Sequence, residues 1–224
     1  MFKKIALALV VAVGVLAAVV ATRPSDFRIE RSTTINAPAD IAYGLVSDFH
    51  GWADWSPWEA LDPTMKKTFT GQAGEKGSSY EWLGNKDVGS GRMTIVDVKP
   101  SSLVEIKLEF ITPWQATNQT TLTFEPAGDK TKVSWAMTGH NNFFMKAMTL
   151  FMNMDKMVGA DFEKGLAKLG EKSAAEHAVR VATAQKKAAE EAAQRAAAEA
   201  AVHKAAEEAA QAATAPASAS QKKS

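Results

Sequence analysis

The sequence of 224 residues contains no cysteine, and this absence excludes several kinds of site at once. Disulfides, zinc–thiolate sites, iron–sulfur clusters and cysteine nucleophiles all require a thiol. The absence does not distinguish an oxidising compartment from a reducing one, because proteins of both compartments can do without disulfides.

The chain also lacks an excess of charge of either sign. Its formal net charge is +1, and its basic residues are scattered, so it has no cluster of positive charge of the kind that binds nucleic acid. We therefore expect no nucleic-acid partner. The sequence has no G-x-G-x-x-G before a helix, no phosphate-binding loop, no G-x-S-x-G and no H-E-x-x-H or paired-histidine pattern. We expect no metal and no cofactor.

One long apolar run lies at the N-terminus. Lys3 and Lys4 precede the apolar residues 5–21, which as a helix would be about 26 Å long and nearly cross a bilayer core of about 30 Å. A signal peptide cleaved after Val19-Val20-Ala21 is the alternative. We favour an uncleaved anchor within residues 1–25, because the run is longer than a usual signal-peptide core. Basic residues are retained on the cytoplasmic side, so the paired lysines predict a single-pass inner-membrane protein with its remainder on the periplasmic or extracytoplasmic side.

Residues 171–224 have a different composition. Nearly half of the residues up to Ala215 are alanine, and most others are Glu, Lys, Gln or Arg, which together form helices strongly. Charges of largely alternating sign recur every four residues along one face, at Lys187, Glu191, Arg195, Glu199, His203 and Glu207. Large apolar residues are too sparse for a coiled-coil seam. The pattern predicts an extended polar helix, similar to the spacer of TolA-like envelope proteins, that offers a surface to a protein partner and ends in a flexible tail from Ala215 to Ser224.

Residues 26–170 have the length of one folded domain. Apolar and polar residues alternate from Phe27 to Ile35, which predicts a strand, and Pro38 opens a short helix that we expect to end at Gly51. Six more strands are expected, separated by turns too short for parallel crossovers. Their ranges are Lys66–Thr70, Ser78–Leu83, Arg92–Val98, Leu103–Phe110, Thr117–Glu125 and Thr131–Thr138.

A last amphipathic helix is expected to cover this antiparallel meander. From Asn142 to Leu169 the apolar residues keep spacings of three and four, with Phe151 near the middle of the stripe. Asn141 or Asn142 can cap the start, and Gly170 can end the helix. The fold class is therefore α+β, with a curved sheet of about seven strands wrapped on a long helix.

Several short sequence segments of this region resemble those of a known family: INAP, SDFHGWADWSPW, GSGRMTI, KPSSLVEIKLEF and FEKGLAKL. Together with the order of elements, they are similar to the SRPBCC superfamily, which has the START-like or birch-pollen-allergen-like helix-grip fold, and more narrowly to its bacterial polyketide cyclase/dehydrase-type members. The resemblance implies a large cavity between the sheet and the long helix that binds apolar ligands. The superfamily mixes carriers, lyases and cyclases, so the fold alone does not assign a function.

The residues expected to line that cavity are aromatic or apolar side chains on the predicted inner faces. They are Trp55, Trp58, Tyr80, Trp82, Met93, Leu108, Phe110, Trp135, Phe144, Phe151 and Met154. Trp52, Trp55 and Trp58 recur every three residues and suit core packing as well as a pocket mouth.

Titratable residues give a weaker signal. We interpret Asp48, His50 and His140 as solvated, and no residue stands out as catalytic. Arg92, Glu81, Asp97 and Asp155 are candidates for inward charges, which the sequence does not resolve.

Three functions compete. The first is a membrane-tethered, noncatalytic binding protein for a hydrophobic or lipid-like small molecule. The second is a cyclase or dehydratase-like enzyme that uses acid/base chemistry in the same cavity, for which the discriminating feature is a buried titratable pair. The third is an envelope interaction protein that uses the C-terminal helix.

Overall fold

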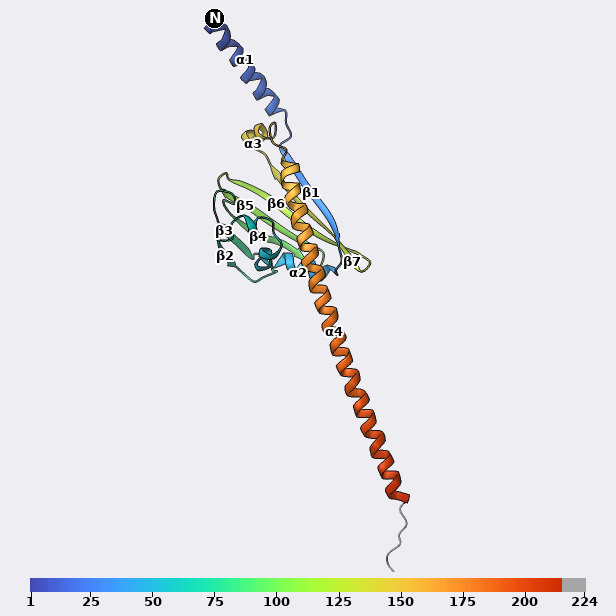
Figure 1. The fold of residues 1–224 in the computed structure, drawn as a ribbon. Helices are drawn as coiled ribbons and strands as arrows, with labels where there is room; N and C mark the ends of the chain where they lie inside the picture. The colour runs from blue at the N-terminus through green and yellow to red at the C-terminus, as the bar shows by residue number, and fades with distance from the viewer. Residues whose placement is uncertain (215–224) are drawn as a thin grey trace, which may run out of the picture. The chain divides into compact units, whose positions relative to one another are not determined.

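The computed structural model describes residues 1–214 of the chain. The predicted tail Ala215 to Ser224 lies outside the described residues. Two compact units divide the chain, Met1–His177 and Ala178–Ser224. The first unit contains an N-terminal helix, a seven-stranded sheet and the helices that cover it (Figure 1).

The sheet is antiparallel throughout, and its strand order is β1-β7-β6-β5-β4-β3-β2. The prediction of an antiparallel meander that follows a first strand is confirmed, with small differences at the strand ends. The first strand pairs with the last because the chain returns to it after the meander. The strands are β1 (Asp26–Ile35), β2 (Lys66–Thr70), β3 (Ser79–Leu83), β4 (Ser90–Lys99), β5 (Leu103–Thr112), β6 (Ala116–Ala127) and β7 (Lys130–His140).

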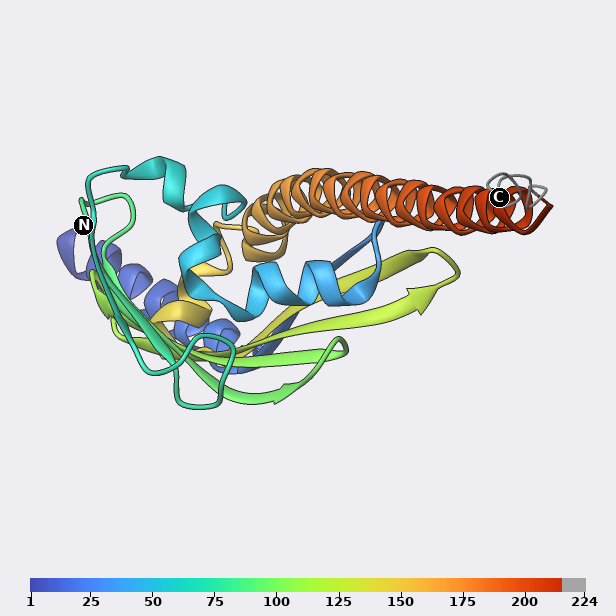
Figure 2. The ribbon, with the colours of Figure 1, turned by 90° about the horizontal axis from the view of Figure 1, so that it is seen from below.

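Helices cover only one face of this curved sheet, so apolar side chains alternate with polar ones along the strands (Figure 2). Ile29, Ile106 and Leu122 point to the covered face, where they are almost completely buried. The core continues into the last helix through Phe162, Leu166 and Leu169. The helix-grip α+β fold expected from the sequence is confirmed.

The short helix after β1 ends earlier than predicted. Helix α2 spans Ala39–Ser47, and the chain turns at Asp48, which is extended. The Asp48 carboxylate accepts a 2.9 Å hydrogen bond from the backbone N–H of His50, and this cap starts a 3-10 helix, η1 (Phe49–Asp54). A second 3-10 turn, η2 (Glu59–Leu61), precedes β2. The expected helix end at Gly51 is therefore wrong, because a capping aspartate intervenes.

The prediction of one helix from Asn142 to Leu169 is also wrong. The structure has a short α3 (Phe143–Met148), a break, and then α4 (Met154–Thr214). Two asparagines cause the break. Asn142 caps α3 by accepting from the N–H of Met145, and Asn153 accepts from the N–H of Lys156 to begin α4.

Helix α4 does not stop at Gly170. This glycine remains helical, and a Cβ at its position would lie 3.1 Å from a methyl carbon of Ile35. Gly170 therefore allows close packing of α4 on the end of β1, while the alanine-rich sequence that follows continues the helix.

The two terminal segments are helical as expected. Helix α1 (Phe2–Ala21) is long and apolar enough to cross a membrane, as judged by its length and composition. In the second unit, the described part of α4 is solvent-exposed and carries ion pairs four residues apart, such as Lys187 with Glu191 and Lys204 with Glu208.

Candidate functional site

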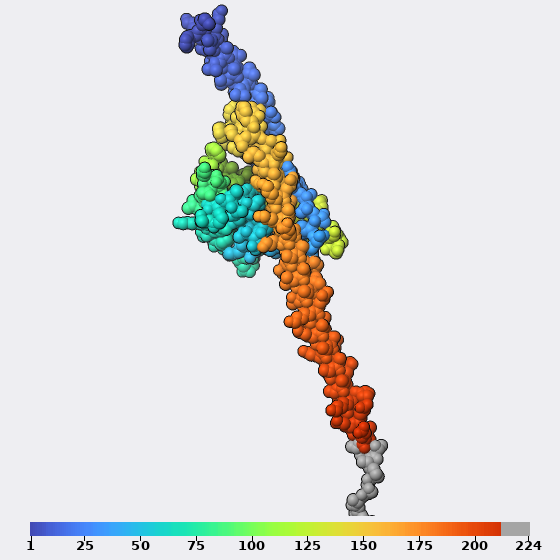
Figure 3. Space-filling model, viewed as in Figure 1, coloured from blue at the N-terminus to red at the C-terminus, as the bar shows by residue number. Residues whose placement is uncertain are grey.

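A cavity of about 250 Å³ lies between the covered face of the sheet, the 3-10 segment and the first half of α4. The space-filling view shows the surface hollowed between α4, the cyan 3-10 region and the green strands, just below α3 (Figure 3). The lining is mostly aromatic and apolar. It consists of Trp52, Ser56, Trp58, Glu59, Met65, Tyr80, Trp82, Asp87, Val88, Met93, Leu108, Phe110, Thr120, Trp135, Met137, Val158 and Phe162.

Most of the residues expected at the cavity line it. They are Trp58, Tyr80, Trp82, Met93, Leu108, Phe110 and Trp135. All but Trp58 are on strands, where the alternation of faces places them inward.

The remaining four do not line the cavity. Trp55 is fully buried in the core beneath it, and Met154 packs on the edge of that core. Phe144 is more than half exposed on α3, and Phe151 is 79% exposed in the break between α3 and α4. Helical spacing placed Phe151 on the inner stripe, but the break removes it from the helix. Phe162, eleven residues further along the chain and within α4, lines the cavity instead.

Stacked and edge-on rings form the wall nearest α4. The rings of Trp135 and Phe162 stack at a centroid distance of 4.3 Å and an interplanar angle of 5°. Trp52, Trp55 and Trp58 approach Trp135 edge-on. Large rigid rings of this kind can hold a cavity open against collapse of the surrounding side chains.

Hydrogen bonds fix two of these indoles. Trp52 and Trp55 donate their Nε1–H groups to the carbonyls of Val46 and Leu45 on α2, at 2.8 and 3.1 Å. The Nε1 of Trp135 is buried and has no hydrogen-bond partner among the described residues. A buried donor without an acceptor is costly, so this atom lowers the stability of the wall.

A glycine sets the distance between α4 and this wall. A Cβ at Gly165 would lie 2.8 Å from Cζ3 of Trp135 and 3.1 Å from Cδ of Pro57. Contacts this short are not tolerated by real Cβ atoms. Gly165 therefore permits the helix to lie directly against the indole.

Besides the exposed Asp87, the cavity lining has one carboxylate, and it is buried: that of Glu59. This side chain is only 9% exposed, yet it lines an otherwise apolar space. Its Oε1 accepts a 2.7 Å hydrogen bond from the hydroxyl of Tyr80, and its Oε2 pairs with the ammonium group of Lys67. Burial is the main cause that raises the pKa of Tyr80 far above its ordinary value, and the neighbouring Glu59 raises it further.

The sequence analysis missed Glu59. A lone glutamate in a turn-rich segment has no motif around it, and its partners Tyr80 and Lys67 come from two strands that the sequence does not place beside it. Its position directly after the aromatic segment was the one available signal. The arrangement brings together a carboxylate, a neutral phenol and an ammonium group, which can position or transfer a proton on a bound molecule.

The other titratable candidates lie outside the cavity. Arg92 and Glu81 pair with each other on exposed positions of neighbouring strands, and Asp97 is half-buried on β4. Asp155 pairs with Arg31, which lowers the pKa of the Asp155 carboxyl through its hydrogen bonds. The geometry thus assigns these groups to the surface and to the attachment of α4 to β1.

His50 and His140 are solvent-exposed as well. His50 pairs with Asp48 at 2.8 Å and His140 with Asp26 at 2.9 Å. Among residues 1–214, no three or more His, Cys, Asp or Glu side chains are grouped so that they could hold a metal ion.

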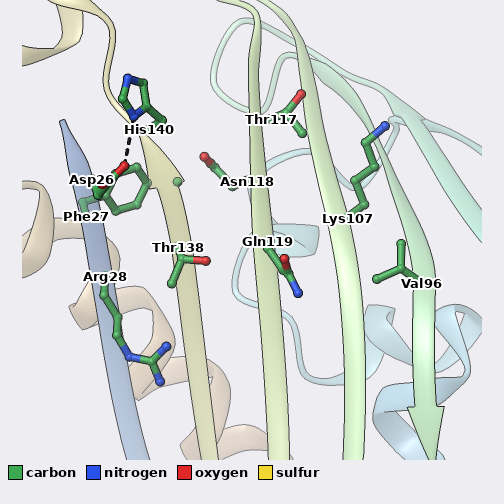
Figure 4. A pocket seen from close by; sticks show the side chains of 11 residues that line it. Asp26, Phe27, Arg28, Val96, Lys107, Thr117, Asn118, Gln119, Thr138 and His140 are labelled. Atoms are coloured by element: carbon green, nitrogen blue, oxygen red, sulfur yellow. Dashed lines mark hydrogen bonds and ion pairs between the residues drawn. The ribbon is translucent and has the colours of Figure 1, made fainter.

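A second, open depression lies on the uncovered face of the sheet. Figure 4 shows a row of side chains that crosses five strands: Arg28, Thr138, Gln119, Lys107 and Val96. Each of these residues alternates with a buried neighbour, so the row faces away from the core. The depression is wide and open, and most of the residues around it are polar, so it has no enclosed apolar wall for a hydrophobic ligand.

Comparisons with known proteins agree with this geometry. The model of a family described as polyketide cyclase / dehydrase and lipid transport matches residues 26–174. No match to an individually curated protein was found.

Solved structures resemble the fold at low sequence identity. A Thermobifida fusca protein superposes with a TM-score of 0.51 at 20% identity and covers 65% of this chain and 92% of its own. A Chromobacterium violaceum protein has a TM-score of 0.49 at 15% identity, covering 68% and 99%. The major latex-like protein 151 of Panax ginseng has a TM-score of 0.45 at 13% identity, covering 68% and 97%.

Proposed function

The chain belongs to the polyketide cyclase / dehydrase and lipid transport family of the SRPBCC superfamily, and from that premise we propose that it is a membrane-tethered binding protein for a hydrophobic or lipid-like small molecule. The observation that carries the proposal is the cavity of about 250 Å³ with an aromatic and apolar lining. Binding sites for small molecules have this character, with few polar groups placed among apolar walls.

The lining supports a ligand of apolar body and limited polarity. Met65, Met93 and Met137 contribute flexible thioether side chains that adapt to irregular apolar shapes. Burial of an apolar ligand against such walls gives about 25 cal/mol for each Å² removed from water. The Glu59–Tyr80 pair offers a polar contact that orients the ligand.

The tether is α1. Its apolar side chains are almost all exposed in the described structure, as a bilayer-spanning segment requires. The paired Lys3 and Lys4 favour a cytoplasmic N-terminus and a folded domain on the other side of the membrane. The domain would then meet its ligand at the membrane surface.

A second function, acid/base catalysis, is favoured by one specific observation. Glu59 and Tyr80 form the buried titratable pair in the cavity that an enzyme of the cyclase or dehydratase kind needs. If the protein is an enzyme, a cell extract incubated with it yields a product that is absent with Glu59→Gln. A binding protein gives no product with either chain.

The binding proposal is tested with the apolar dye N-phenylnaphthylamine and the full chain in nanodiscs, after subtraction of the signal from the dye in protein-free nanodiscs of the same lipid. Leu108→Trp replaces an aliphatic side chain of the cavity lining with a larger indole ring. Lys107→Trp puts the same indole ring on the uncovered face, one residue away. Both variants carry one added tryptophan, and dye binding is followed by directly excited dye fluorescence, because energy transfer would depend on where that tryptophan lies. We expect Leu108→Trp to weaken dye binding several-fold relative to Lys107→Trp. Equal binding by the two variants would contradict a ligand site at this cavity.

A further inference from the structure

The two ends of the sheet differ in character. At one end lie the connections that enter β1 and β2 and leave β7, together with the β3–β4 and β5–β6 loops. At the other end lie the connections after β1, β2, β4 and β6. Antiparallel pairing fixes this division, because alternate connections of a meander share an end.

Exposed large apolar side chains in the folded part of the first unit lie at the first of these ends. We call them the apolar rim, and they are Leu61, Leu83, Ile111, Trp114, Phe143, Phe144, Phe151 and Met157. The connections at the opposite end, residues 36–38, 71–78, 100–102 and 128–129, contain no exposed large apolar residue in the described chain. Concentration of such side chains at one end marks an interaction surface.

Contacts join parts of the rim to each other. The rings of Trp114, in the β5–β6 loop, and Phe144, on α3, lie 6.4 Å apart between centroids. Leu61 accepts a hydrogen bond through its carbonyl from the side chain of Asn85 in the β3–β4 loop. The rim is therefore built from several connections that meet at one end of the sheet.

The tether begins at this same end. The backbone N–H of Asn141, two residues before α3, donates a 2.7 Å hydrogen bond to the carbonyl of Ser25. Helix α1 ends at Ala21, four residues before Ser25, and four residues span at most about 14 Å. The end of α1 cannot move further than this from Ser25, which is held to Asn141 just before α3, whatever direction the helix takes.

We propose that the apolar rim is a docking surface for the bilayer that α1 enters, with Trp114, Phe143 and Phe144 in its headgroup region. This inference rests on the membrane tether of the proposed function. Tryptophan and phenylalanine are favoured at the boundary between headgroups and acyl chains. The short connection to α1 holds the rim within reach of that boundary, and no other surface of the domain has comparable apolar side chains.

Docking in this orientation brings the cavity to the membrane. Asp87 and Val88 of the β3–β4 loop and Phe110 near the end of β5 belong to both the cavity lining and the rim end of the sheet. Asp87 is the exposed member of the lining, so the opening lies beside that loop. An apolar ligand would pass between bilayer and cavity without crossing water.

The absence of cysteine makes the test direct, since single cysteines can be introduced for labelling. Gln115→Cys places an environment-sensitive fluorophore beside Trp114, Asp129→Cys places it in the β6–β7 turn at the opposite end, and Gly14→Cys places it within α1. Each full-length chain is reconstituted into vesicles of phosphatidylethanolamine and phosphatidylglycerol, with and without brominated acyl chains. We expect blue-shifted emission and bromine quenching at positions 14 and 115 and neither at position 129.

The outcomes separate docking from tethering. A quenched label at position 14 with water-like emission at position 115 overturns the docking proposal and leaves the tether standing. Quenching at 115 without quenching at 14 supports docking and removes the tether, and water-like emission at both positions removes both. Adding Trp114→Ser and Phe144→Ser to the Gln115→Cys chain should abolish the blue shift there. Added to the Gly14→Cys chain, the same pair should leave the emission of the label in α1 unchanged, since both replaced side chains are exposed.

Discussion

The hydroxyl of Tyr80 donates a 2.7 Å hydrogen bond to Oε1 of Glu59, and both side chains are buried where β3 and the 3-10 segment meet at the cavity wall. An apolar pocket thus contains one fixed polar group. Because Lys67 pairs with the other carboxylate oxygen, the charge of Glu59 is compensated within the protein.

This pair predicts an unusual alkaline titration. An unfolded tyrosine ionises near pH 10, whereas burial and Glu59 raise the pKa of Tyr80 well above that value. Above about pH 10 the unfolded chain loses this proton and the folded chain keeps it, so the free energy of unfolding should fall as the pH rises. Denaturation curves from pH 8 to pH 11 should show this decline, and Tyr80→Phe should make it shallower. Tyrosinate absorbance from Tyr80 near pH 10 in a chain that is still folded would contradict the assignment.

Tyr80→Phe should also destabilise the protein at neutral pH. The substitution keeps the ring and removes one donor from a buried carboxylate, which costs about 1–3 kcal/mol. Urea denaturation of the two chains at pH 7 measures the difference. A variant as stable as the original would show that Glu59 does not depend on this hydrogen bond.

Truncation to alanine should lower the stability of the protein strongly at Phe162 and hardly at all at Phe151. Phe162 is 1% exposed and stacks on Trp135, so Phe162→Ala should cost about 3–5 kcal/mol. Phe151→Ala removes an exposed ring and should change stability by less than about 0.5 kcal/mol. Denaturant midpoints decide between them, and comparable losses in both variants would mean that Phe151 is part of the core.

Two glycines in helices form a matched pair. Gly165→Ala puts a methyl group against Trp135 and should destabilise the protein by about 1–3 kcal/mol. Gly44→Ala in α2 meets nothing within 4 Å and should stabilise it by up to about 1 kcal/mol through helix propensity. Thermal unfolding of both variants checks the sign of each effect. A stabilising Gly165→Ala would show that α4 does not lie tightly on the indole.

The sequence predicted the sheet well because its signals are local. Alternation from Phe27 to Ile35 and the short glycine- and proline-containing turns determine strands and antiparallel order without knowledge of tertiary contacts. The same alternation placed Leu108 and Trp135 on the covered face.

The last helix could not be predicted from apolar spacing alone. The residues from Asn142 onward keep helical periodicity, but Asn142 and Asn153 each cap a separate helix. A side-chain cap competes with continuation of a helix. The spacing of apolar residues carries no information about that competition. Phe151 was misplaced for this reason.

Glu59 was missed for a different reason. Its role arises from burial and from Tyr80 and Lys67, which are brought to it by the pairing of β2 with β3. A polar group that functions through partners distant in sequence leaves no local pattern. Gly165 was missed for the same reason, since the need for a glycine there arises from its close approach to Trp135, which is distant in sequence.

The central claim, an apolar ligand in the cavity between sheet and α4, is tested most directly by native mass spectrometry of the full chain purified from its own cells. The original chain and Lys107→Trp should retain a noncovalent adduct that organic solvent extracts, and Leu108→Trp, which fills the cavity, should have lost it. The absence of an adduct from the original chain, or the same adduct on all three chains, would contradict the account.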